Sequence, residues 1–113
     1  MTSGLGATLR DALLNIASIE YAFIFGSVAR GEEGPGSDVD VCVVGDALNR
    51  DVINAMSAVE QSVARPVNAL VYKLDELREK VTGENYFVSK MMGSKKIFLI
   101  GNDDELERAT QQS

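Results

Sequence analysis

The sequence has 113 residues, of which 45% are hydrophobic and 25% are charged, values typical of one globular domain. Its net charge of −6 argues against a protein that grips DNA or RNA through many phosphates, because such binding needs clustered lysine and arginine. The absence of histidine excludes a Ser-His-Asp triad, a Cys-His pair and a histidine-based zinc site. Any metal site must therefore use oxygen ligands, which favours Mg²⁺, Mn²⁺ or Ca²⁺.

The whole chain, 1–113, is predicted to form one domain, with a core over about 5–101 and an acidic C-terminal tail over 102–113, whose "NDDELE" is expected to be a solvated helix start or tail. No charged leader followed by an apolar core begins the sequence, and no apolar run approaches the roughly 20 residues of a membrane helix. The one cysteine, Cys42, cannot form an intrachain disulfide. These features favour a cytoplasmic protein without a membrane segment.

The first half of the chain predicts a helix, a strand, a turn region and a second strand. Apolar residues at helical spacing indicate an amphipathic helix over 5–17. The apolar run 20–26 is typical of a short buried strand, and the glycine-rich stretch 27–37 of turns. Alternating polar and apolar residues predict the second strand over 38–44.

The second half begins with a helix that Asp46 is expected to cap, with apolar positions from Leu48 to Val63 and a stop at Pro66. The remaining predicted elements are a strand over 67–72, a helix over 75–81 closed by Gly83, a helical stretch carrying Tyr86, Phe87 and Met91, and a strand over 96–100. Only the first two strands are joined by a turn-like connection. The predicted fold is therefore α/β (α+β), with a mixed sheet of about four strands and helices packed against it.

Two aspartates on one face of the second strand are the first candidate site residues. Asp38 and Asp40 point to the same face because side chains alternate along a strand, and their Cα atoms should lie roughly 7 Å apart. Two like charges so close repel each other unless a cation lies between them, and aspartate is depleted in strands. The pair can hold one divalent metal, or two metals a few Å apart as in phosphoryl transfer, although a solvated strand edge is the simpler alternative.

The Gly-Ser pair ten residues before Asp38 adds a candidate anion site. If Ser27 opens a helical turn, the first backbone N–H groups of that turn are free to bind a phosphate, which Gly26 lets approach the backbone. Arg30, one turn on, could reach the same phosphate or pair with a nearby carboxylate. A Gly-Ser turn alone is common, so the signal lies in its combination with the two aspartates.

That combination, "FGSVARGEEGPGSDVDV", resembles the minimal nucleotidyltransferases of the DNA polymerase beta-like superfamily. Their signature is an apolar residue, Gly, Gly or Ser, a short gap, and then Asp-apolar-Asp-apolar. The predicted element order over 5–100 also suits that fold. The stretch from "RPVNALVY" to "GNDDEL" looks like nucleotidyltransferase domains of antitoxins or of proteins that also carry a winged-helix domain.

The resemblance implies a role for each matching position. Gly26 and Ser27, with Arg30 and Ser37 nearby, would bind the nucleoside triphosphate, and Asp38 and Asp40 would bind Mg²⁺ (or Mn²⁺) and act as the catalytic carboxylates. The implied reaction transfers a nucleoside monophosphate, for which AMP is the first candidate, to an acceptor hydroxyl and releases pyrophosphate. The implied partners are a toxin or a DNA-binding protein, and a homodimer would also suit so small a domain.

The sequence departs from this family at one position. Active members carry a third carboxylate on the next core strand, where "VNALVY" places Asn68. An asparagine can ligate a metal through its carbonyl oxygen, but it carries no charge and cannot take a proton. The alternative function is therefore a catalytically impaired nucleotide-binding or regulatory, antitoxin-like module.

Three further groups are predicted to have structural roles. Cys42 is expected to be a small buried residue, because nothing nearby in the sequence activates it as a nucleophile. The residues around Tyr86, Phe87 and Met91 are expected to be core or a partner-facing patch, with a nucleobase platform as the alternative. Lys90, Lys95 and Lys96 are expected to be solvated, with phosphate contact as the alternative.

Overall fold

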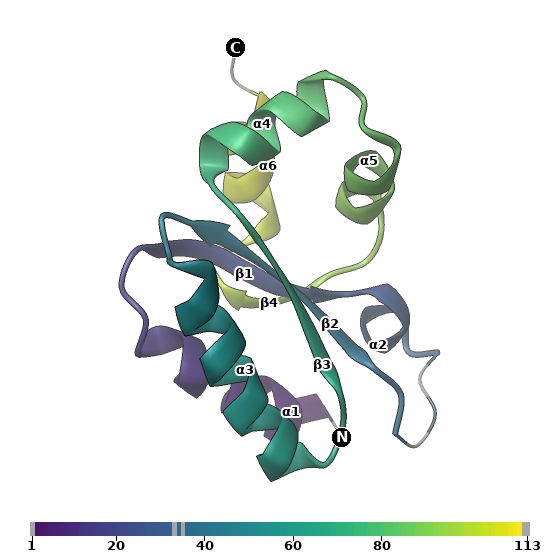
Figure 1. Cartoon of the computed structure of the whole chain (residues 1–113). Coiled ribbons are helices and arrows are strands. Elements are labelled where there is room, and N and C mark those ends of the chain that lie inside the picture. The colour runs from purple at the N-terminus through teal and green to yellow at the C-terminus, as the bar shows by residue number, and fades with distance from the viewer. Residues whose placement is uncertain (1, 33, 35, 112–113) are drawn as a thin grey trace.

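The computed structural model of the chain describes residues 2–32, 34 and 36–111. The described elements are α1 (Thr2–Leu14), β1 (Ile19–Phe25), α2 (Gly26–Arg30), β2 (Val39–Gly45), α3 (Asn49–Val63), β3 (Val67–Tyr72), α4 (Leu74–Thr82), α5 (Tyr86–Gly93), β4 (Ile97–Ile100) and α6 (Asp103–Gln111). The strands form one sheet in the order β3-β2-β1-β4 (Figure 1). β1 runs antiparallel to β2 and β4, and β2 runs parallel to β3, so the predicted mixed sheet is confirmed.

Helices cover both faces of this sheet (Figure 1). α1 and α3 pack on one face, where Val39, Val41 and Val43 of β2 are fully buried. α4, α5 and α6 pack on the other face, around Cys42 and Val44 of the same strand. Each buried valine contributes about 1.5–3 kcal/mol through removal of apolar surface from water, so this alternation fixes the register of β2.

α1 ends earlier than the sequence predicts. The helix stops at Leu14, and the chain turns, with Ser18 at a positive φ of 73°, before β1 begins. Ile16 nevertheless packs against the core from this turn, where its backbone N–H donates to Leu13. An apolar residue at helical spacing can thus be buried without being helical.

The prediction that Asp46 caps the next helix is wrong. The Asp46 N–H donates to the carbonyl of Ser18 at 3.0 Å, which extends the β1–β2 pairing, and its carboxylate pairs with Lys73 at 3.8 Å. α3 begins only at Asn49, and its N-cap residue, Leu48, offers no capping side chain. Asp46 therefore forms its backbone hydrogen bond at the end of the sheet and does not cap α3.

Two other regions are more ordered than expected. The first part of the predicted turn region 27–37 is helical, as α2, while Glu33 and Pro35 lie outside the described residues. Most of the predicted solvated tail forms α6, which packs on α4 and buries Leu106 fully; residues 112–113 are outside the description. The folded core therefore extends beyond residue 101.

Lys96 also differs from its prediction as a solvated residue. Its side chain is only 5% exposed and pairs with Asp103 at 3.3 Å, while its ammonium donates to the carbonyls of Met92 and Ser94. The charge is buried because these three partners replace its water. Lys96 thus joins the end of α5 to the start of α6.

The helices of the described part of the chain are all too short or too polar to cross a lipid bilayer.

Candidate active site

Strand pairing brings the predicted site residues to one end of the sheet. Phe25, the last residue of β1, lies opposite Asp40, near the start of the antiparallel β2. Asp40 in turn lies opposite Asn68, near the start of the parallel β3. Gly26 follows Phe25, and Asp38 precedes β2 by one residue. Both therefore lie at the same end of the sheet as Asn68.

The side chain of Asn68 lies between the two aspartates. Its Nδ2 donates to Asp38 Oδ2 at 3.2 Å and to Asp40 Oδ1 at 3.3 Å. Asp38 and Asn68 are exposed and Asp40 is half-buried, so the three groups face solvent. β3 therefore has the register that the sequence predicts, and the Asn68 side chain lies next to both carboxylates.

The donor set fits a magnesium ion. Mg²⁺ prefers oxygen ligands and is often held by one or two carboxylates together with waters and substrate phosphates. Asp38 and Asp40 supply two such carboxylates around one point, and rotation of the Asn68 amide would present its carbonyl oxygen there. Among the described residues, no three Asp, Glu, His or Cys side chains are placed so that they could hold a metal ion together, and at this site the third position is the carboxamide of Asn68.

Position 26 requires glycine for two reasons, its backbone conformation and the closeness of Asp40. It has a positive φ of 73°, which L side chains rarely adopt. A Cβ at this position would lie 2.6 Å from Asp40 Oδ2, closer than any real contact. Glycine therefore lets the backbone of the β1–α2 junction touch the carboxylate directly.

α2 begins at this junction, with Ser27 as its second residue. The first N–H groups of a helix lack intrahelical acceptors and carry partial positive charge. The other end of this short helix is closed by Gly31 at a φ of 74°, and the Glu32 N–H donates to the Ser27 carbonyl at 2.9 Å. The sequence-based condition for an anion site, that Ser27 opens a helical turn, is thus met.

Arg30 and Ser37 have partners of their own. Arg30 Nε pairs with Glu32 Oε1 at 3.1 Å, and both side chains are well exposed. The Ser37 hydroxyl accepts from the Gly34 N–H at 2.8 Å and so closes a turn, while its carbonyl accepts from Arg65 Nε at 3.0 Å. Ser37 thus belongs to the turn that leads into Asp38, and its role in substrate binding stays a prediction.

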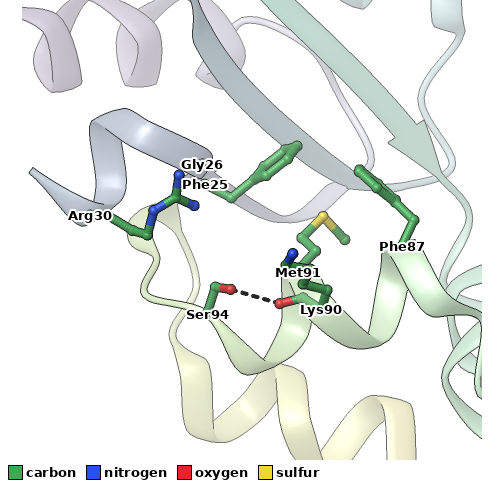
Figure 2. A pocket seen from close by; sticks show the side chains of 7 residues that line it. All are labelled: Phe25, Gly26, Arg30, Phe87, Lys90, Met91 and Ser94. Atoms are coloured by element: carbon green, nitrogen blue, oxygen red, sulfur yellow. Dashed lines mark hydrogen bonds between the residues drawn. The ribbon is translucent and has the colours of Figure 1, made fainter. Parts of the chain in front are cut away.

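A pocket of about 170 Å³ adjoins Gly26, between the start of α2 and α5 (Figure 2). Its lining residues are Phe25, Gly26, Arg30, Phe87, Lys90, Met91 and Ser94. The sequence predicts ligand roles for Gly26 and Arg30, and offers them for Phe87, Met91 and Lys90 only as alternatives. It gives no signal for Phe25 and Ser94, because α5 meets the end of β1 only through tertiary packing.

Cys42 does not take part in this site. It is fully buried, and burial raises the pKa of its thiol from 9.0 to about 12. The thiol therefore stays protonated at neutral pH and is a poor nucleophile. Its predicted role as a buried structural residue is confirmed.

Two solved structures that are similar to this chain share the fold at low sequence identity. One is a toxin–antitoxin complex with AMP-PNP, at 16% identity, a TM-score of 0.63, and coverage of 93% of this chain and 80% of that one. Another is a tri-AMPylated HEPN toxin of Shewanella oneidensis in complex with its MNT antitoxin, at 15% identity, a TM-score of 0.61, and coverage of 97% and 81%. No curated protein matches the sequence.

The family comparison covers nearly the whole fold. The sequence model of the family described as "Nucleotidyltransferase domain" matches residues 7–108, from α1 into α6. This span contains the Gly-Ser pair, both aspartates and Asn68. The chain belongs to the nucleotidyltransferase domain family.

Proposed function

We propose that this chain is a Mg²⁺-dependent (or Mn²⁺-dependent) nucleotidyltransferase that transfers a nucleoside monophosphate, with AMP as the first candidate, from a nucleoside triphosphate to an acceptor hydroxyl. The observation that carries the proposal is the convergence of Asp38 and Asp40 with the Gly26–Ser27 helix start at one end of the sheet. AMP-PNP in one structural relative and an AMPylated toxin beside another support the choice of nucleotide.

Each residue has a task that its position allows. The first N–H groups of α2, starting at Ser27, would bind phosphate oxygens, and Gly26 would let those oxygens approach the backbone. Asp38 and Asp40 would hold the divalent cation, which when bound neutralises phosphate charge and lowers the pKa of a coordinated hydroxyl. Arg30, exposed and one turn into the helix, would contact an outer phosphate.

Asn68 supports a second candidate function, a nucleotide-binding module with little or no transfer activity. Its amide donates to both carboxylates and cannot accept a proton. Two carboxylates suffice to hold one metal with a triphosphate, whereas activation of the acceptor hydroxyl would lack the third negative charge. In this form the chain would act as an antitoxin-like partner of another protein.

The test uses a nucleoside triphosphate labelled at the α-phosphorus, with Mg²⁺ and a cell extract or purified candidate protein as acceptor. We expect acid-stable label on a macromolecule with the wild type and none with Asp38→Asn/Asp40→Asn. Transfer that is unchanged in the double variant would contradict the enzymatic proposal. Calorimetry on the same samples separates the second candidate, which predicts Mg²⁺-dependent triphosphate binding without any label transfer.

The partner and the compartment belong to the same proposal. A toxin that carries an acceptor hydroxyl would serve as both substrate and binding partner, as the complexes among the structural relatives suggest. A cytoplasmic location would give access to nucleoside triphosphates, and the single, buried cysteine is compatible with a reducing compartment.

A further inference from the structure

The pocket beside Gly26 has an apolar interior and a cationic rim. Phe25, Phe87 and Met91 provide ring and thioether surface, while Arg30 and Lys90 stand at its edge (Figure 2). Gly26 belongs both to the wall of this pocket and, through its contact with Asp40, to the candidate metal site. A ligand could therefore occupy the pocket and the metal site at once.

Phe87 is held in place although almost half of it is exposed. Its ring meets that of Phe25 edge to face, with centroids 6.1 Å apart and planes at 79°. The helix that carries it is fixed by Asn85, whose side chain accepts from the Val88 N–H at 3.0 Å. Phe87 is 47% exposed, a large aromatic surface left in water beside the pocket. Such a fixed and partly uncovered ring is suited to stacking against a flat ligand.

The size of the pocket limits what can enter it. Pockets that enclose a whole drug-sized ligand measure roughly 300–1,000 Å³, well above the 170 Å³ found here. The pocket can therefore enclose one ring system and not a complete nucleotide. We propose that it receives the nucleobase of the nucleoside triphosphate, stacked on Phe87, with the phosphates passing over Gly26 toward Asp38 and Asp40; this rests on the proposed function.

The charges around the pocket agree with this orientation. Arg30, from α2, and Lys90, from α5, both line the pocket (Figure 2). A ligand that is flat and apolar at one end and anionic at the other would place its flat end against the aromatic rings and its anionic end near the two cations. Arg30 is itself paired with Glu32 at 3.1 Å, so a phosphate at this rim would compete with Glu32 for Arg30 and would meet Lys90 directly.

The lining also predicts weak discrimination between bases. Among the described residues that line the pocket, none is a carboxylate or a carboxamide, and its one side-chain hydroxyl, of Ser94, donates to the Lys90 carbonyl at 2.7 Å. Sites built to hydrogen-bond a substrate reject an analogue by about 10⁴-fold, whereas stacking tolerates every base. We expect ATP, GTP, CTP and UTP to bind within about tenfold of one another.

The test compares two neighbouring aromatic residues by calorimetry with Mg²⁺-ATP and with Mg²⁺-tripolyphosphate, which has no base. Phe87→Ala should weaken ATP binding about 5- to 150-fold and leave tripolyphosphate binding unchanged, because base stacking is lost and phosphate contacts remain. Phe87→Trp should restore ATP binding. Tyr86→Ala is the matched control, since Tyr86 is 78% exposed, sits on the same helix and does not line the pocket.

The outcomes separate this inference from the function on which it rests. ATP binding that is unchanged in Phe87→Ala, with tripolyphosphate still bound, would overturn the base pocket and leave the proposed function standing. No binding of either ligand by the wild type would overturn both. A direct readout is the NMR spectrum of the wild type, in which the Phe87 ring signals should shift with ATP and stay in place with tripolyphosphate; the reverse would also contradict the inference.

Discussion

Gly26 and Asp40 are in direct contact, so that a Cβ on Gly26 would lie 2.6 Å from Asp40 Oδ2. The Gly-Ser pair and the aspartate pair, separated by a ten-residue segment, thus form one unit. The contact exists because Phe25 and Asp40 are paired across β1 and β2. The shape of the turn at Gly26 and Ser27 and the position of the Asp40 carboxylate therefore depend on each other.

Gly26→Ala should disturb both the backbone and the site. A positive φ costs an L residue about 1–2 kcal/mol, and the new methyl group must displace the Asp40 carboxylate. We expect a loss of stability of this size in chemical denaturation together with a loss of Mg²⁺-ATP binding in calorimetry.

Gly31→Ala is the matched control for that variant. Gly31 has nearly the same φ, 74°, but a Cβ there would meet no atom within 4 Å. It should lose similar stability and keep nucleotide binding. Equal losses of binding in the two variants would show that backbone strain alone is responsible and that the contact with Asp40 is irrelevant.

Asn68→Asp should make the stability of the chain depend on metal. Without metal, a third carboxylate beside Asp38 and Asp40 replaces two hydrogen bonds by repulsion, so the melting temperature should fall. With Mg²⁺ the same charge strengthens the site, and tenfold tighter binding would add up to about 1.4 kcal/mol of stabilisation. Thermal denaturation with Mg²⁺ and with EDTA measures both effects.

Asn68→Ala separates charge from the loss of the amide. It also removes the hydrogen bonds to the aspartates, but it adds no ligand, so its response to Mg²⁺ should not exceed that of the wild type. If Asn68→Asp responds to Mg²⁺ no more than Asn68→Ala does, residue 68 is not at the metal.

Cys42 should make the chain less stable at high pH. Burial raises the pKa of its folded-state thiol from 9.0 to about 12, so the stabilising preference for the protonated form is complete below pH 9 and is lost as pH rises toward 12. Between these values each pH unit should cost about 1.4 kcal/mol. The free energy of unfolding, measured from pH 8 to 11, should fall more steeply than in Cys42→Ala.

The titration of Tyr72 must be removed from that comparison. Its pKa is raised by burial and by the charges of Cys42 and Glu76, so it would contribute in the same pH range. Both chains should therefore carry Tyr72→Phe. Parallel pH profiles of the two chains would show that the Cys42 thiol ionises as easily when folded as when unfolded.

Leu106 should be essential to the fold even though it lies in an acidic segment. Its side chain is fully buried among Leu77, Val88 and Met91. Leu106→Ala should cost about 2–5 kcal/mol in urea denaturation, as expected for a leucine removed from a core. The exposed neighbour Glu107→Ala should change stability by less than about 0.5 kcal/mol. A similarly small effect at Leu106 would mean that α6 does not belong to the cooperative core.

Local patterns in the sequence predict the sheet and the relative positions of Asp38, Asp40 and Asn68 well. The alternation around Val39, Asp40 and Val41 reflects a strand with two different faces, and this holds in the structure. The place of Asn68 follows from strand register, because a one-residue slip would turn its side chain to the other face. These features depend on the period of a strand, which the sequence records directly.

Features that depend on packing between distant elements were not predictable in this way. α6 has few apolar residues, and Leu106 shows as core only once α4 lies against it. Asp46 resembles a helix cap, yet its N–H is used by Ser18 across the sheet end. The pocket beside Gly26 exists only because α5 lies next to the end of β1, which is far earlier in the chain.

The most direct measurement of the central claim is calorimetric titration of the chain with ATP in the presence and absence of Mg²⁺, for the wild type and for Asp38→Asn/Asp40→Asn. Both substitutions keep side-chain size, remove the negative charge and leave one carbonyl oxygen to accept from Asn68, so folding should survive. The account predicts binding by the wild type that requires Mg²⁺ and that the double variant loses. Binding of equal strength by both chains, or by the wild type with and without Mg²⁺, would contradict a metal–nucleotide site at Asp38 and Asp40.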